Sequence, residues 1–175
     1  MQQTLFLTLG YPGAGKTTAA KIIHKLTGAE HLWADRVRRK MYKQPTYSHQ
    51  ENMHLYTHLN DLASELLSEG KSVIFDTNFN FYRDRQHLRQ IASKNKAKVV
   101  IVWVQADKQV AKQRATVDAH LHKHTRVLGN MPIKHFERIS NNLESPREDE
   151  KFVELDGTMI DDDYVEQRLH EVGIV

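Results

Sequence analysis

The chain has 175 residues, a formal net charge of +3 and no cysteine. This length fits one domain that can bury a substantial core without disulfides or structural metals. The missing cysteines exclude disulfides, thiolate zinc sites and cysteine nucleophiles. No apolar run is long enough to span a bilayer, and the first residues lack the features of a signal peptide. We therefore expect a single cytoplasmic domain over residues 1–175, with no membrane association and no obligate protein partner.

The small net charge hides an uneven distribution along the chain. Residues 1–136 contain 21 Lys and Arg against 10 Asp and Glu, whereas residues 137–175 contain 4 against 12. An acidic C-terminal helix on a basic body would explain this pattern, and so would a positive cleft for phosphate-rich ligands. The second explanation favours a phosphorylated or nucleic-acid acceptor.

Short apolar runs alternate with helical periodicity along the whole chain. Strands are predicted at residues 5–9, 31–33, 73–75, 99–104 and 152–155. Helices are predicted over residues 16–26, 55–66 and 83–94, and from about residues 107, 132 and 161 onward. Strands separated by helices need crossovers, so we expect a three-layer α/β/α fold with a five-stranded, mainly parallel sheet. In such sheets, ligands bind beyond the carboxyl ends of the strands.

A glycine-rich motif follows the first predicted strand. It reads Gly10-Tyr11-Pro12-Gly13-Ala14-Gly15-Lys16-Thr17 and matches G-x-x-x-x-G-K-[ST]. Its glycines let successive N–H groups point inward around phosphates, and the next helix presents its N-terminus, with Thr18, to the same groups. Lys16 would reach the β- and γ-phosphates, and the Thr17 hydroxyl would ligate Mg²⁺. The motif predicts that residues 10–18 bind ATP with Mg²⁺.

The second predicted strand leads into Asp35-Arg36-Val37-Arg38. If a helix starts at Asp35, Arg38 lies one turn further on the same face. The carboxylate could accept the proton of an attacking hydroxyl, and the arginine could hold a phosphate on the acceptor. Alternatively, Asp35 only caps the helix and Arg38 is a solvated surface residue. The tetrad alone leaves both interpretations open.

The third predicted strand ends in an aspartate, in the run Val73-Ile74-Phe75-Asp76. This is the Walker B pattern, in which the carboxylate assists Mg²⁺ directly or through water. The polar residues that follow, Asn78 among them, could line an acceptor pocket or simply form an Asx-type turn.

A cation-rich segment spans about residues 108–135. In a protein that transfers phosphate, such a segment suggests a mobile, basic, helical lid whose arginines close over the transferring group. Arg114 and Arg126 are the candidates for this catalytic role. The alternative is a solvated basic loop.

Taken together, three motifs resemble the kinase domain of phage-type polynucleotide 5′-hydroxyl kinase. They are the glycine-rich loop at residues 10–17, Ala34-Asp35-Arg36-Val37-Arg38, and Phe75-Asp76-Thr77-Asn78-Phe79-Asn80. More broadly, the chain is similar to the P-loop kinases that include zeta toxins and chloramphenicol phosphotransferase. The similarity extends over nearly the whole chain.

The resemblance implies an adenylate-kinase-like fold with ATP·Mg²⁺ as the phosphate donor. It implies that Asp35 is the general base, that Arg38 binds an acceptor phosphate, and that Arg114 and Arg126 act at the transferred phosphate. Asp76 matches a functional aspartate of the same group. The acceptor would be the 5′-hydroxyl of a nucleic acid or nucleotide. A small-molecule kinase and an ATP-binding module or slow ATPase without an acceptor remain as alternatives.

Overall fold

The computed structural model of the chain describes residues 2–175. Its five strands form one sheet in the order β2-β3-β1-β4-β5, and every neighbouring pair is parallel. The strands are β1 (Thr4–Leu9), β2 (Glu30–Trp33), β3 (Val73–Asp76), β4 (Lys98–Gln105) and β5 (Phe152–Asp156). The sheet confirms the predicted architecture.

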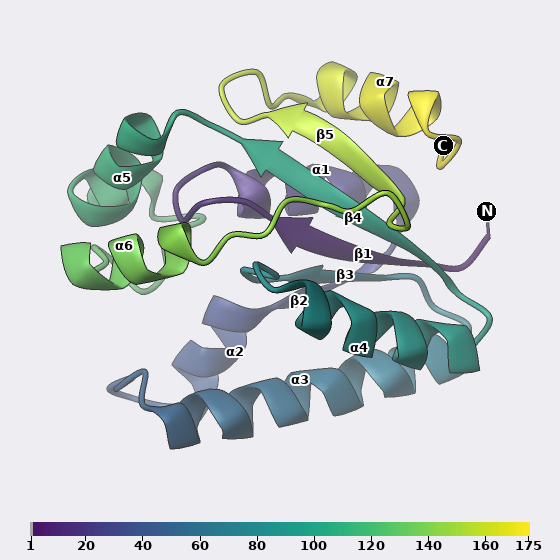
Figure 1. The fold of residues 1–175 in the computed structure, drawn as a ribbon, viewed down its shortest axis with the longest axis horizontal. Coiled ribbons are helices and arrows are strands. Elements are labelled where there is room, and N and C mark those ends of the chain that lie inside the picture. Colours follow the sequence, from purple (N-terminus) through teal and green to yellow (C-terminus); the bar gives the residue numbers. More distant parts are fainter. Residues whose placement is uncertain (1) are drawn as a thin grey trace.

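Helices cover both faces of the sheet and give three layers (Figure 1). Helices α1 and α7 cover one face, and α3 and α4 cover the other, with α2 beside them. The helices are α1 (Lys16–Thr27), α2 (Ala34–Met41), α3 (His49–Ser68), α4 (Tyr82–Lys94), α5 (Lys108–Thr116), α6 (Ile133–Asn141) and α7 (Asp162–Glu171), with a 3₁₀ helix, η1 (Asp118–His122), between α5 and α6.

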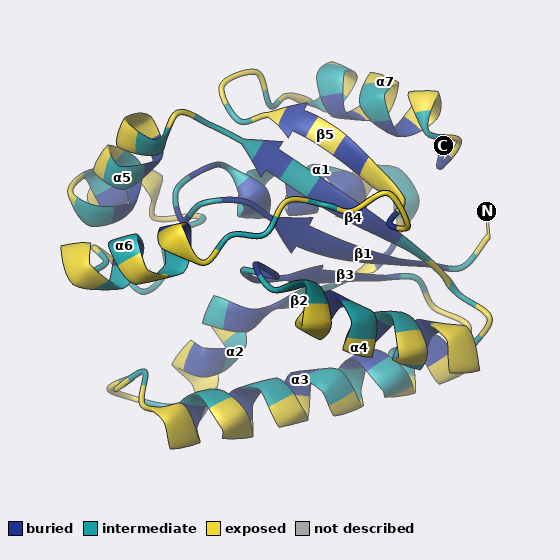
Figure 2. Ribbon diagram, viewed as in Figure 1, coloured by how far each residue is buried: buried dark blue, intermediate teal, exposed yellow. Residues whose placement is uncertain are grey.

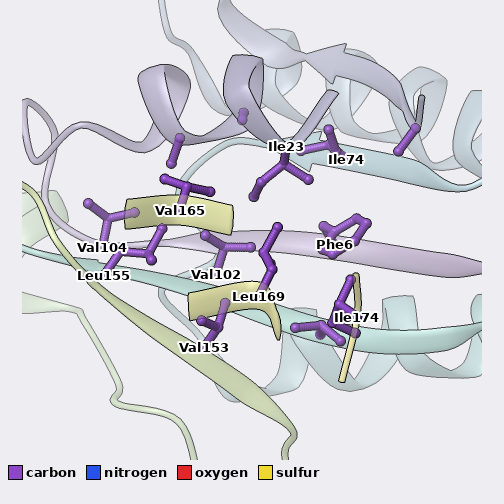
Figure 3. Close-up of a cluster of buried hydrophobic side chains, with 14 of the residues drawn as sticks. Phe6, Ile23, Ile74, Val102, Val104, Val153, Leu155, Val165, Leu169 and Ile174 are labelled. Carbon is purple, nitrogen blue, oxygen red and sulfur yellow. The ribbon is translucent and has the colours of Figure 1, made fainter. Parts of the chain in front are cut away.

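The central strands are buried on both sides, which explains why they are apolar at successive positions (Figure 2). In β1, Phe6 points toward α1 and α7, into a cluster that contains Ile23, Val102 and Leu169 (Figure 3). Its neighbours Leu5 and Leu7 belong to the opposite cluster, under α3 and α4. This alternation holds the first strand, and so the loop that follows it, between two cores.

Local signals set several helix ends. Ser48 caps α3 by accepting a hydrogen bond from the Glu51 amide, and Asp107 caps α5 by accepting bonds from two amides. Asp161 caps α7 in the same way. The alternative interpretation, in which Asp35 caps helix α2, is wrong. Trp33 holds the cap position, and Asp35 lies in the first turn of the helix.

The segment predicted as a lid forms α5, η1 and α6, beyond the carboxyl ends of β1 and β4 (Figure 1). Glu137 of α6 pairs with Lys108 and Lys112 of α5, and Phe136 packs on Ala111 and Ala115. These contacts hold α5 and α6 together as one block. Helix α6 ends at residue 141, beyond the predicted end of the segment. In residues 2–175, no helix is both long and apolar enough to cross a membrane.

Candidate active site

A cavity of about 750 Å³ opens at the carboxyl ends of the strands. Most of the predicted site residues line it: Pro12, Gly13, Gly15, Lys16, Thr17, Thr18, Asp35, Arg38, Asp76, Asn78, Arg114 and Arg126. The other three, Gly10, Tyr11 and Ala14, belong to the glycine-rich loop but do not line the cavity. Residues far apart in the sequence therefore meet where a parallel sheet places its ligands.

The glycine-rich loop has backbone angles that require glycine. Gly10, Gly13 and Gly15 have φ values of 146°, 83° and 113°. A Cβ on Gly10 would lie 2.3 Å from the Val104 carbonyl oxygen, so the loop packs closely on β4. The loop delivers the N-terminus of α1 to the cavity, where the first amides lack acceptors within the helix. This donor set suits a phosphate chain.

Lys16 is buried at the base of this loop. Its Nζ atom donates hydrogen bonds to the carbonyl oxygens of Gly10, at 3.0 Å, and Tyr11, at 2.7 Å. Burial lowers the pKa of Lys16 to about 8; Asp76 and Asp35 oppose this change, and Arg126 adds to it. A buried ammonium group with a lowered pKa would be stabilised by an added anion.

Asp35 is half-buried and lines the same cavity. Burial raises its pKa, and the nearby carboxylate of Asp76 acts in the same direction. The cations of Arg126, Arg38 and Lys16 lower it, but the net direction is upward. A carboxylate with a raised pKa is a better proton acceptor for an attacking hydroxyl group.

Arg126 enters the cavity from the segment between η1 and α6. Its Nη2 atom donates to the Ala115 carbonyl oxygen at 3.3 Å, whereas its buried Nε–H has no partner among residues 2–175. Burial lowers the pKa of Arg126, and the charge of Asp35 opposes this effect. This unpartnered donor could bind an anion in the cavity that Asp35 and Lys16 also line.

Arg114 contacts a different part of the wall. Its Nη1 atom donates to the Gly157 carbonyl oxygen at 3.3 Å, in the loop after β5. The Gly157 amide in turn donates to the Gln105 carbonyl oxygen at 2.6 Å. A Cβ on Gly157 would lie 2.0 Å from the Ala14 carbonyl oxygen. This loop therefore packs directly against the back of the glycine-rich loop.

Asp76 ends β3 and lines the cavity together with Thr17. Its Oδ2 atom lies 3.0 Å from Nε2 of His31, whose ring stacks on that of Trp33. Oxygen ligands of this kind suit Mg²⁺, which usually keeps waters and substrate phosphates as its other ligands. In the described part of the chain, no group of three or more His, Asp or Glu could hold a metal ion by itself. The residues fit a cation that arrives with a nucleotide.

Arg38 lies in the cavity wall, but its guanidinium group already has partners. It forms a buried ion pair with Glu51 and donates to the Asn52 side chain at 2.7 Å. Glu51 also accepts bonds from the Thr46 amide and hydroxyl; these and Arg38 outweigh its burial and lower its pKa. The ring of Tyr47 stacks over the guanidinium group at 4.7 Å. The expected phosphate-binding arginine is thus neutralised within the protein.

Several residues of the site had no role predicted from the sequence: His31, Glu51, His135 and Arg138 line the cavity or support its wall. Glu51 could have been noticed, because Ser48-x-x-Glu51 is a capping-box pattern. Its side chain instead binds Arg38 and Thr46. The positive φ of Tyr47, 56°, has no sequence signature.

The matches to known proteins agree with this geometry. Residues 5–132 match the model of the AAA domain family. The chain belongs to this family. No curated protein shows significant sequence similarity to the chain.

Solved structures share the fold over almost the entire chain. A protein described as a kinase from Chloroflexus aurantiacus J-10-fl has a TM-score of 0.75 and 17% identity, over 98% of both chains. A gluconokinase from Sinorhizobium meliloti 1021 has a TM-score of 0.67 and 18% identity, over 97% of this chain and 91% of that one. The APS kinase CysC of Mycobacterium tuberculosis, in complex with AMPPNP and APS, has a TM-score of 0.68 and 14% identity, over 98% and 97%.

The structure of a Pnkp1/Rnl/Hen1 complex is similar over a smaller part. The match covers 66% of this chain and 40% of that one, with a TM-score of 0.58 and 18% identity. At these identities the similarities establish the P-loop kinase fold.

Proposed function

We propose that the protein transfers the γ-phosphate of ATP to an acceptor hydroxyl group, and that this acceptor is the 5′-hydroxyl of a nucleic acid or nucleotide. The observation that carries the proposal is the convergence of Lys16, Asp35 and Arg126 in one cavity. The three groups come from distant segments: Asp35 and Arg126 act on the pKa of Lys16, Lys16 and Arg126 act on that of Asp35, and Asp35 acts on that of Arg126.

The donor half of the site is the glycine-rich loop with the first turn of α1. Backbone amides of residues 13–18 would hold the phosphate chain, and Lys16 would exchange its two carbonyl partners for phosphate oxygens. Thr17 and Asp76 would hold Mg²⁺, which when bound neutralises charge on the phosphates.

The acceptor half is where Asp35 faces the cavity. Asp35 orients the acceptor hydroxyl and takes its proton as the oxygen attacks the γ-phosphorus atom, while the bond from that atom to the β-phosphate oxygen breaks. ADP leaves with the bonding electrons. Lys16 and Arg126 balance the charge on the transferring group, so most of the rate enhancement comes from positioning and electrostatics.

The choice of a 5′-hydroxyl acceptor is supported by the resemblance of three motifs to those of polynucleotide kinases. The cavity lining, which combines arginines with Trp33, Tyr47 and Tyr56, suits bases and phosphates. A small-molecule alcohol is the second candidate. It is favoured by the uncharged amide side chains of Asn52, Asn60 and Asn78 in the wall and by the full-length likeness of fold to a gluconokinase.

The test uses γ-labelled ATP, Mg²⁺ and a panel of alcohols: 5′-hydroxyl oligonucleotides, nucleosides and their 3′-phosphates, sugars and antibiotic alcohols. We expect label in the 5′-position of the nucleic acid or nucleotide. Label only in small, non-nucleotide alcohols would refute the acceptor assignment. Label released only as inorganic phosphate would indicate an ATPase.

Two matched carboxylate variants complete the test. Asp35→Asn should lower transfer by about 10²- to 10⁴-fold while ATP still binds. Asp84→Asn is the control, because Asp84 also lines the cavity but pairs with Arg83 on α4. Equal activity of the two variants would remove Asp35 from the mechanism.

A further inference from the structure

Two helices face each other across the acceptor side of the cavity. From α3 the lining residues are His49, Asn52, Met53, Tyr56 and Asn60; from α6 and the residue that follows it they are His135, Arg138, Ile139 and Asn142. Both sets have spacings of three and four residues, so each helix presents one face to the cavity. The face of α3 is uncharged apart from His49, whereas the face of α6 carries an arginine and a histidine.

The packing of α6 turns its acidic residue away from the cavity. Glu137 lies beside Lys108 and Lys112 of α5, and Phe136 is buried against α5 as well. Arg138 and His135 are left on the opposite side of the helix. In residues 2–175, neither of them lies within 4.0 Å of a carboxylate.

Arg138 and His135 are joined by a hydrogen bond, which determines the donors and acceptors that remain available to a ligand. Nη2 of Arg138 lies 3.0 Å from Nδ1 of His135, and a guanidinium group can only donate. Nδ1 is therefore the acceptor, and Nε2 carries the proton of the neutral ring. Both residues thus have only N–H donors left for another molecule.

Two arginines act on the electrostatics of His135. Burial lowers its pKa, and the cations of Arg138 and Arg38 lower it further. The ring of Tyr47 lies 5.2 Å from that of His135, and the charge of Asp35 contributes to the raised pKa of Tyr47. Tyr47 therefore lies beside His135 and within electrostatic range of Asp35.

We propose that His135 and Arg138 form a subsite for a phosphate group carried by the acceptor, in place of Arg38. The proposal rests on the proposed function, since it assumes that the acceptor hydroxyl lies at Asp35. Arg38 is committed to Glu51 and Asn52, whereas the N–H groups of His135 and Arg138 have no anionic partner. The ligand class is a hydroxylated molecule that also carries a phosphate ester, such as a nucleoside 3′-phosphate.

The experiment compares the binding of a nucleoside 3′-phosphate with that of the unphosphorylated nucleoside, by isothermal titration calorimetry without ATP. The wild type should bind the phosphorylated compound at least about 10-fold more tightly, as charge-assisted hydrogen bonds imply. Arg138→Gln should remove most of this preference and leave nucleoside binding unchanged. Lys134→Gln, which removes a charge from a residue of the same helix that does not line the cavity, should keep the preference.

Kinetics with the same two acceptors separate this proposal from the function on which it rests. Arg138→Gln should raise KM about 10-fold for the phosphorylated acceptor, with little change in kcat and little change for the nucleoside. Transfer to both acceptors with no preference in the wild type, or an equal loss for both in Arg138→Gln, would refute the subsite while the kinase function stands. No transfer to any alcohol would instead refute the proposed function, and the binding experiment would still decide whether the subsite exists.

Discussion

Arg85 and Glu150 form an ion pair that is fully shielded from solvent. Nε and Nη2 of the arginine each donate a 2.8 Å hydrogen bond to the carboxylate, and Nη1 donates to the carbonyl oxygens of Phe79 and Glu144 at 3.0 and 3.1 Å. The pair therefore connects the loop after β3, which carries part of the acceptor wall, to the segment before β5.

Removing one member of this pair should strongly destabilise the protein. We expect Arg85→Met to lower the free energy of unfolding by about 3–5 kcal/mol, because the Glu150 carboxylate is then buried without a partner. Urea denaturation gives the value. Arg89→Met is the control: Arg89 pairs with Asp149 at the surface, so its loss should cost less than about 1 kcal/mol. Similar losses in the two variants would contradict this prediction.

Asp35 should limit stability while it supports activity. A carboxyl group whose pKa is raised on folding holds its proton more tightly in the folded state, so the folded state loses stability as pH rises through that pKa. Asparagine resembles the neutral acid. Thermal unfolding between pH 4 and 8 should therefore show Asp35→Asn with an equal or higher Tm than the wild type, and with a difference that grows from the ordinary pKa of 3.8 up to the raised pKa of the folded state. A Tm difference between Asp35→Asn and the wild type that falls as pH rises would contradict this prediction. It would show that the cations around Asp35 have a larger effect on its pKa than burial has.

Nucleotide binding should change the protonation of Lys16. Its pKa is about 8 in the free protein, below the ordinary value of 10.5. A triphosphate stabilises the charged amine and raises this pKa, so binding should take up protons at pH 9, and far fewer at pH 7, where the amine is already charged. Calorimetry in buffers with different ionisation enthalpies measures this uptake. AMP lacks the β- and γ-phosphates and should show none; equal uptake for AMP and ATP would assign it to another group.

The close contact at Gly157 predicts an effect on ATP affinity. In Gly157→Ala, the new Cβ would meet the Ala14 carbonyl oxygen at 2.0 Å, so the loop after β5 must move away from the glycine-rich loop. We expect ATP affinity to fall by about 10-fold or more, which corresponds to about 1.4 kcal/mol. Gly70→Ala is the control: Gly70 has open space around it but a φ of 80°, so its replacement should cost about 1 kcal/mol of stability and leave ATP affinity intact. Unchanged ATP affinity in Gly157→Ala would mean that the displaced loop does not affect the nucleotide site.

Much of the fold was predictable because its signals are local. The apolar runs of β1, β3 and β4 and the glycines at positions 10, 13 and 15 are read directly from neighbouring residues. Parallel topology then requires that Lys16, Asp35 and Asp76 meet at one end of the sheet, and the structure brings them together.

The partners of the site residues were not predictable, because they come from distant segments. Arg38 was expected to face an acceptor phosphate, yet its pairing with Glu51 depends on how the loop before α3 folds back. In the same way, no local pattern indicates that His31 contacts Asp76, or that α6 turns Arg138 toward the cavity and Glu137 away from it. Sequence patterns located the charged residues, whereas tertiary packing decides which charges remain free for a ligand.

The attachment of α6 to α5 has a mechanical consequence. Glu137 bonds two lysines of α5, and the Met131 amide donates to the Ala115 carbonyl oxygen at 2.9 Å, so these elements are joined into one unit. Arg114 and Arg126 belong to this unit, and so does Arg138. If this unit moves relative to β4 and β5, all three guanidinium groups move together. Placing positive charge beside the phosphate donor would then be coupled to binding of the acceptor.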